Sequence, residues 1–137
     1  MDFKDNSEEY KELRDTAIRR GLRAIGMTAE NHAKSNCPVD TGYARNSITH
    51  ALSGESADIS SYKADAGKNG EPPKTGEYRG TLGEIEDNYV LIGSNVEYFP
   101  FIEEGARGRE AHHTLRKAAT DHKDEYKQLL TDSIKNA

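Results

Sequence analysis

Histidine supplies the first residues whose type could bind a metal, because His112 and His113 are adjacent and His122 follows in the same expected helix. A metal site needs several ligands that converge on one point. Neighbouring helical residues point about 100° apart, so His112 and His113 diverge. His32 and His50 stand far from the others in the sequence. The pattern therefore predicts no metal site and no cofactor.

Asp40, Thr41 and Ser47 are the residues whose types could suggest hydrolysis. A serine-type hydrolase needs a nucleophile on a sharp turn and a histidine at a recognisable spacing, and the sequence shows neither. The glycines in 67–83 fit no phosphate-binding spacing. The single cysteine, Cys37, precedes a proline, and free cysteines usually pack as small apolar residues. We therefore expect no catalytic residue and no enzymatic activity.

The composition indicates one small domain, 1–137, with a modest core. The chain has 137 residues, of which 34% are hydrophobic and 31% are charged. Such a polar chain suits a protein that gains stability from neighbours in an assembly, although a marginal monomer with long loops has the same composition. With one cysteine, no disulfide can form within the chain.

The charge and hydropathy exclude two broad classes. A net charge of −5 argues against a general binder of nucleic acid, and it leaves Arg107 and Arg109 as the one basic cluster on a loop. No run approaches the ~20 apolar residues of a membrane span, so no membrane partner is expected. The first residues do not read as a signal peptide.

The first expected element is a helix over 6–36. Its apolar residues recur at steps of three and four: Tyr10, Leu13, Ala17, Ile18, Leu22, Ile25, Ala29 and Ala33. Asn6 and Glu9 form a capping box at its start, and Pro38 ends it. Gly21 and Gly26 weaken its middle and would permit close packing or a bend.

A turn over 38–42 and a strand over 44–52 are expected next. Residues 53–80 then form a long insertion rich in glycine and polar residues, in which Tyr62 and Tyr78 are the large apolar groups. Two interpretations carry equal weight: an arm that orders only against a neighbouring subunit, or a solvated hairpin tip.

The remaining residues predict a hairpin, a short helix and a long helix. Asp87-Asn88 separates apolar runs over 81–94, which indicates a tight hairpin with a strand over 89–92. Pro100 places a short helix from Tyr98 to just before Gly105. We expect its aromatic segment 98–102 to be buried under the sheet. A final helix should cover 111–136. The fold class is α+β, with a small antiparallel sheet packed by a long N-terminal helix, a short central helix and a long C-terminal helix.

Three segments resemble one family, the bacteriophage neck proteins typified by the tenth gene product of a lambdoid siphophage and related to minor tail protein Z of lambda-like phages. The first segment, 37–48, shares Pro38, Asp40, Thr41, Gly42, Arg45 and Ser47 with the family's pattern. The second, 92–105, shares Gly93, Tyr98, Pro100, Glu103 and Gly105, but it has Phe99 and Glu104 where the family has other residue types. The third, 111–118, lacks the family's prolines.

The resemblance implies a structural virion protein of the head–tail connector, or neck, of a long-tailed bacteriophage. It implies partners: other copies of the chain in a ring, the head-closure protein, and a tail terminator or tail-tube protein. Non-specific contact with DNA in the channel, and assembly in the cytoplasm of the bacterial host, are further implications. A tail-terminator or tail-completion ring protein is the close alternative, and a small non-enzymatic regulatory module is the alternative from another class.

Two expectations concern particular contacts. We expect Tyr62, Tyr78, Arg107 and Arg109 to meet neighbouring subunits, because aromatic and arginine side chains anchor interfaces. Glu103, at the C-terminal end of the short helix, should pair with an arginine, for which Arg45, Arg107 and Arg109 are the candidates. An exposed, weakly stabilising ion pair is the equal alternative for Glu103.

Overall fold

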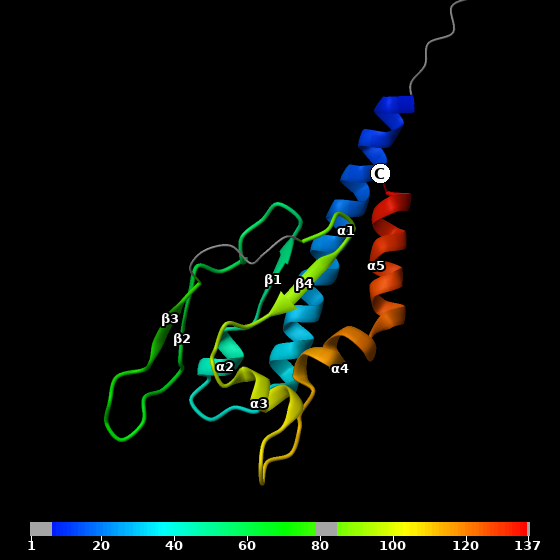
Figure 1. Cartoon of the computed structure of the whole chain (residues 1–137). Coiled ribbons are helices and arrows are strands. Elements are labelled where there is room, and N and C mark those ends of the chain that lie inside the picture. Colours follow the sequence, from blue (N-terminus) through cyan, green and yellow to red (C-terminus); the bar gives the residue numbers. More distant parts are fainter. Residues whose placement is uncertain (1–6, 79–84, 137) are drawn as a thin grey trace, which may run out of the picture.

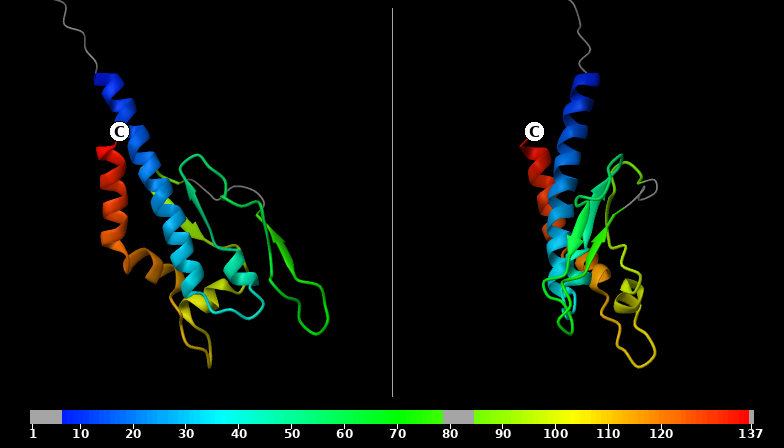
Figure 2. Two further views of the ribbon diagram at one scale, coloured as in Figure 1. Left: turned by 180° about the vertical axis from the view of Figure 1, so that it is seen from behind. Right: turned by 90° about the vertical axis from the view of Figure 1, so that its left-hand side faces the viewer.

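The protein has a small α+β fold, which confirms the predicted class. The computed structural model describes residues 7–78 and 85–136. A long N-terminal helix, two small antiparallel sheets and a bent C-terminal helical segment make up the described part of the chain (Figure 1). Two helices of the C-terminal segment pack on the N-terminal helix. The larger sheet packs on the other side of the N-terminal helix, away from the last helix (Figure 2).

The first helix, α1 (Ser7–Asn36), ends directly before Cys37-Pro38, as predicted. The cap proposed at Asn6 lies outside the described residues. Gly21 and Gly26 permit close packing: a Cβ on Gly21 would lie 2.8 Å from Leu130 Cδ1, and one on Gly26 would lie 2.7 Å from His50 Cδ2. These glycines therefore let the last helix and the sheet approach opposite sides of α1 at short range.

The larger sheet pairs β1 (Thr49–Leu52) with β4 (Val90–Gly93) in antiparallel register, His50 opposite Ile92. The strand predicted over 44–52 is therefore wrong in its first half, where Tyr43–Asn46 form the short helix α2. The N–H of Asn46 donates to the carbonyl of Gly42 across 2.9 Å, which closes a helical turn before the strand can begin.

The hairpin predicted over 81–94 can be followed only from residue 85 onward. The turn at Asp87-Asn88 is present, with Asn88 at a φ of 68° and the N–H of Tyr89 donating to the Glu86 carbonyl. Among the described residues, β4 pairs with the distant β1. Leu82 and the rest of 79–84 lie outside the described residues.

The insertion forms a second antiparallel pair, β2 (Ser61–Lys63) with β3 (Thr75–Glu77), which projects beside the larger sheet (Figure 1). We call residues 61–77 the arm. Tyr62 lies on the arm, is only 8% exposed and joins the core cluster together with Tyr43 and Phe99. The base of the arm is thus packed against the rest of the chain.

The predicted helix over 111–136 is wrong as a single helix. The segment after α3 (Phe99–Glu104) continues as α4 (Thr114–Thr120) and α5 (Lys123–Lys135), which meet at a bend. His122, between them, has φ −124° and ψ 28°, which breaks the helical path without a glycine or a proline. The bend lets both helices follow α1, because α4 and α5 each pack on it.

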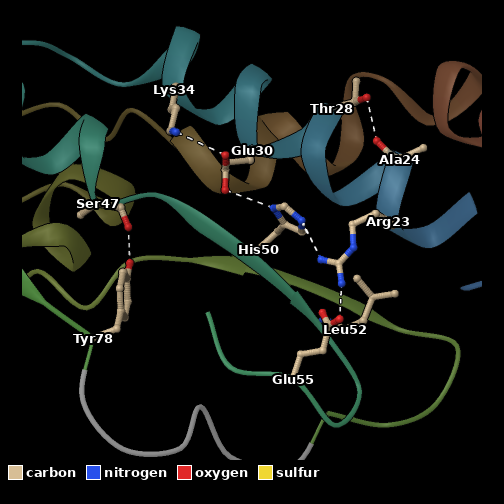
Figure 3. A network of polar contacts seen from close by, with 10 residues as sticks. All are labelled: Arg23, Ala24, Thr28, Glu30, Lys34, Ser47, His50, Leu52, Glu55 and Tyr78. Carbon is tan, nitrogen blue, oxygen red and sulfur yellow. Dashed lines mark hydrogen bonds and ion pairs between the residues drawn. The ribbon is translucent and has the colours of Figure 1, made fainter. Parts of the chain in front are cut away.

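A chain of polar side chains crosses the interface between α1 and β1 (Figure 3). His50 is 1% exposed and lies between Arg23 and Glu30. Its Nε2 is 3.1 Å from Arg23 Nη1, and its Nδ1 is 3.1 Å from Glu30 Oε1. Arg23 also pairs with Glu55, whose carboxylate accepts a hydrogen bond from the Leu52 N–H. These contacts satisfy polar groups that burial would otherwise leave without partners.

None of the described helices is long and apolar enough to cross a membrane.

Candidate functional site: the groove between the two motifs

The two longer family-like segments, far apart in the sequence, form the walls of one groove of about 660 Å³. Residues 38–44 form one wall, and Tyr98, Phe101 and Ile102 of the second segment form another. The far end of the arm, with Lys68, and the loop before α4 complete the lining. Five of the eleven motif residues therefore line the groove: Pro38, Asp40, Thr41, Gly42 and Tyr98.

The wall at 38–42 is shaped by a left-handed turn. Gly42 has a φ of 83°, and a Cβ there would lie 2.5 Å from Asp65 Oδ2. The carbonyl of Thr41 accepts the N–H of Asp65 at 2.7 Å, and the carboxylate of Asp40 pairs with Lys68 at 2.5 Å. Pro38 lines the same wall and is exposed. This turn thus holds both the base and the far part of the arm.

Arg45 and Asn46 fix the base of the arm through Asp65. Asn46 Nδ2 donates to Asp65 Oδ1 at 2.9 Å and to the Lys63 carbonyl at 2.7 Å, and Arg45 forms an ion pair with the same carboxylate. The hydrogen bond from Asn46, followed by the charge of Arg45, holds the pKa of Asp65 below its usual value. The carboxylate of Asp65 is therefore charged, and it ties the arm to the first motif.

Ser47 and Ser94 join the two motifs at their buried ends. Their hydroxyl oxygens lie 2.5 Å apart. Ser47 Oγ donates to the Ala44 carbonyl at 2.6 Å, so Ser94 must supply the hydrogen between the two hydroxyls. Gly93, the last residue of β4, brings Ser94 to this position. The serine pair therefore fixes the two walls of the groove relative to each other.

The aromatic segment 98–102 is only partly buried, which corrects the sequence prediction. Phe99 is 3% exposed in the core, whereas Tyr98 is 41% and Phe101 is 57% exposed. Pro100, in the first turn of α3, is exposed, and Gly105 ends this helix with a φ of 84°. A single helix turn directs successive side chains to different sides, so Phe99 enters the core and the partly buried Ile102 packs against it. Tyr98 and Phe101 face the groove.

Tyr62 and Tyr78 belong to the chain's own core, which corrects their predicted place in an interface. The Tyr62 ring packs between the rings of Tyr43 and Tyr78, with centroid distances of 5.2 Å and 5.4 Å. The Tyr62 hydroxyl donates a hydrogen bond to Asn95 Oδ1. The half-buried Tyr78 donates to the Ser47 carbonyl. Desolvation raises the pKa of Tyr62 above its usual value and that of Tyr78 to about 12. Both rings therefore help to hold the arm against the rest of the chain.

Glu103 caps a helix and does not pair with an arginine as predicted. Its Oε2 accepts the N–H of Leu115 and its Oε1 accepts the N–H of Arg116, each at 2.9 Å. A carboxylate at the start of α4 also interacts favourably with the helix dipole. The neighbouring Glu104 is the residue that pairs with an arginine, Arg116, at 3.3 Å.

Arg107 and Arg109 lie on the exposed loop 105–112. Arg109 lines the groove and Arg107 does not. The loop is closed by a short antiparallel bridge between Ala106 and Arg109.

No family model, curated protein or solved structure matches the chain.

The chemistry of the lining suits contact with another polypeptide. Its described part includes no serine or cysteine nucleophile, and its Asp40 is paired with Lys68. Exposed Val39, Tyr98 and Phe101 give the groove an apolar floor, while charged residues surround it. The sequence identified the motifs but wrongly predicted that Phe101 is buried. A helix of one or two turns has too few residues for its apolar pattern to show which face meets the core.

Proposed function

We propose that this chain is a structural subunit of the neck of a long-tailed bacteriophage, and that it joins the head-closure layer to the tail by assembling into a ring. The observation that supports this proposal is the groove itself. Both family-like motifs form it, and it leaves Val39, Tyr98 and Phe101 exposed at one end of the molecule. Exposed aromatic side chains in a concave site typically bind a partner.

A second copy of the chain is the occupant that we assign to the groove. A second exposed apolar pair lies near the N-terminal end of α1, where Tyr10 is 69% and Leu13 is 55% exposed. This end projects beyond the sheet at the opposite end of α1 from the groove (Figure 1). At ~1.5 Å per residue, the part of α1 from Leu13 to Asn36 separates the two surfaces by roughly 35 Å.

Two different surfaces at opposite ends favour a head-to-tail contact. Such a contact, in which one copy's helix end enters the next copy's groove, generates a closed ring when the rotation between copies allows closure. A symmetric dimer would instead use the same surface twice. The proposed interface is therefore of the kind that a ring requires.

The test is the oligomeric state of two matched charge variants, measured by size-exclusion chromatography with light scattering. We expect the wild type to oligomerise alone or with head-closure and tail-tube proteins. Phe101→Glu and Leu13→Glu should each abolish this, whereas Met27→Glu on the exposed middle of α1 should not (Met27 is 54% exposed). A wild type that stays monomeric under all these conditions would remove the proposal and would favour the regulatory-module alternative.

Mixing the two variants tests the head-to-tail geometry directly. Phe101→Glu retains an intact helix end and Leu13→Glu retains an intact groove. An equimolar mixture should therefore form a heterodimer that stops growing at two subunits. If the mixture stays monomeric while the wild type assembles, the helix end of one copy does not bind the groove of the next and the ring model is wrong.

DNA contact in the channel is a separate part of the proposal, assigned to Arg107 and Arg109. Their exposed guanidinium groups would bind phosphates without reading the sequence. We expect weak DNA binding that decreases with salt and is lost in the Arg107→Gln/Arg109→Gln double variant. Binding that does not depend on salt would contradict this role.

A further inference from the structure

We propose that His32, His122 and Glu125 bind a divalent transition-metal ion, with zinc as the best match to these ligands. The three residues come from α1, from the bend between α4 and α5, and from the first turn of α5. In the sequence, His32 lies 90 positions before His122, so a sequence search for ligand spacing misses the cluster. The fold brings them together, and this inference is independent of the proposed neck function.

The fold places three candidate ligands, two imidazoles and one carboxylate, close together. The rings of His32 and His122 stack face to face, with centroids 3.5 Å apart and planes 3° apart. His32 Nε2 lies 3.0 Å from Glu125 Oε1, and one ligand atom from each residue lies within 4.8 Å of the others. Ligand atoms around a tetrahedral zinc with bonds of about 2.0–2.1 Å stand about 3.4 Å apart. Two parallel rings 3.5 Å apart cannot both direct a nitrogen at one ion, so one imidazole must turn out of the stack for all three residues to bind it.

The backbone around the cluster is already fixed. The carbonyl of His122 accepts the N–H of Tyr126 at 3.0 Å, and the Tyr126 hydroxyl donates to the Ala118 carbonyl across the bend. The Tyr126 ring lies 6.2 Å from the His122 ring and 6.3 Å from the His32 ring. These contacts hold the imidazole of His122 against α1 before any ion arrives.

The cluster is open enough to admit an ion and a water molecule. The side chain of His32 is 27% exposed and that of Glu125 is 47% exposed. Three protein ligands with a fourth position open to water form a common zinc arrangement, and two histidines with one glutamate are a known ligand set of that kind. The carboxylate also supplies the negative charge that a divalent ion favours.

The other two clusters of suitable residues in the described part of the chain are less favourable. In the group of Glu30, His50 and Asp58, the Nη1 of Arg23 lies 3.1 Å from His50 Nε2 and would repel a cation. In the group of Glu103, Glu104 and His113, both oxygens of Glu103 accept backbone N–H groups of α4. The cluster at His32 has neither obstacle.

An ion bound there would join α1 to the bend between α4 and α5. Since a ligand that binds only the folded state stabilises it, metal binding should raise the midpoint of thermal unfolding. The effect that we assign to the ion is to stabilise the packing of the bend between α4 and α5 on α1.

The test uses the full-length chain without an affinity tag, treated with EDTA and then exchanged into metal-free buffer. We expect calorimetric titration with zinc chloride to give one ion per chain, and excess zinc to raise the thermal midpoint by several degrees. Replacing zinc by cobalt should give visible absorption bands from the bound ion. No heat with zinc and no thermal shift would overturn the proposal.

Matched variants assign the ligands. His122→Ala and Glu125→Gln should each weaken zinc binding at least 10-fold, with unchanged circular dichroism, whereas His112→Ala changes an exposed histidine outside the cluster and should not. Glu125→Gln retains the shape of the side chain, so it separates lost binding from lost folding. Binding that survives in both cluster variants, or is lost in His112→Ala, would place the ion elsewhere and contradict the proposal. The monomeric Phe101→Glu variant should bind zinc as the wild type does.

Discussion

Glu30 accepts a hydrogen bond from His50 inside the protein, with 3.1 Å between Oε1 and Nδ1. The direction of this bond follows from Arg23. A guanidinium has no acceptor, so the His50 Nε2 that lies 3.1 Å from Arg23 Nη1 must accept, and the ring hydrogen must be on Nδ1. The chain from Arg23 through His50 to Glu30 is therefore satisfied in one tautomer only (Figure 3).

The first prediction compares the two partners of Glu30. Glu30→Leu should lower the free energy of unfolding by about 1–3 kcal/mol, because it leaves the N–H of the 1%-exposed His50 without an acceptor. Lys34→Ala removes the more exposed partner of the same carboxylate, 3.3 Å away, and should cost only about 0.3–0.5 kcal/mol. Urea denaturation of both variants measures the difference. Equal losses would show that the buried hydrogen bond contributes nothing beyond the exposed ion pair.

The local elements of the fold were largely predictable from the sequence. Pro38 set the end of α1, and Pro100 with Gly105 set the bounds of α3, because these residues restrict the backbone directly. The pairing of β1 with β4 was not predictable, since it joins residues about 40 positions apart, as Leu52↔Val90 shows. The bend at His122 carries no glycine or proline, and the packing of α4 and α5 on α1 decides it.

The candidate site was predictable in its residues and not in its geometry. The resemblance selected Gly42, Arg45 and Ser47, and the fold shows why each is needed: Gly42 for its backbone angle, Arg45 for Asp65, and Ser47 for Ser94. The exposure of individual aromatic side chains could not be predicted, because apolar residues occur both in the core and on the surface of proteins. The sequence therefore placed Tyr62 outside and Phe101 inside, the reverse of the structure.

The second prediction separates backbone strain from collision at Gly42. Gly42 and Gly54 both have positive φ, 83° and 76°, but only Gly42 has a neighbour within reach of a new Cβ. Gly54→Ala should therefore cost about 1–2 kcal/mol of stability from the left-handed backbone alone. Gly42→Ala should cost more than this, because the Cβ also displaces the Asp65 carboxylate.

Limited proteolysis of the arm gives this prediction a local readout. If Gly42→Ala displaces Asp65, cleavage within 61–77 should become faster than in Gly54→Ala at matched global stability. Equal cleavage rates in the two variants would contradict the role of Gly42 in holding the arm.

The third prediction concerns the cap of α4. Glu103→Ala removes the acceptor of two backbone N–H groups and should lower the free energy of unfolding by about 0.5–2 kcal/mol. Glu103→Gln keeps one acceptor oxygen and should fall between the wild type and the alanine variant. Glu104→Ala is the matched control, because Glu104 contacts only the exposed Arg116 side chain and should cost at most about 1 kcal/mol. A loss in Arg107→Ala or Arg109→Ala as large as in Glu103→Ala would restore the arginine pairing that the sequence suggested.

The fourth prediction concerns the reactivity of Cys37, the only cysteine in the chain. Burial, reinforced by the negative charge of Glu103 and opposed by Arg45, raises the pKa of its thiol from 9.0 to about 11. Only the thiolate reacts with alkylating reagents. We therefore expect iodoacetamide at pH 8 to label the folded protein far more slowly than the urea-denatured protein. Equal labelling rates would show that the thiol is neither buried nor shifted.

The same shift predicts how stability depends on alkaline pH. Because the pKa of the Cys37 thiol is higher in the folded state than in the unfolded state, the folded state retains the proton longer. The contribution of Cys37 to stability is complete below pH 9 and is lost as the pH rises from about 9 through about 11. Tyr78, whose pKa burial raises to about 12, adds a loss of the same sign at higher pH. Urea denaturation between pH 8 and pH 11 should thus show a smaller decline in Cys37→Ala than in the wild type, and an identical decline would contradict the buried thiol.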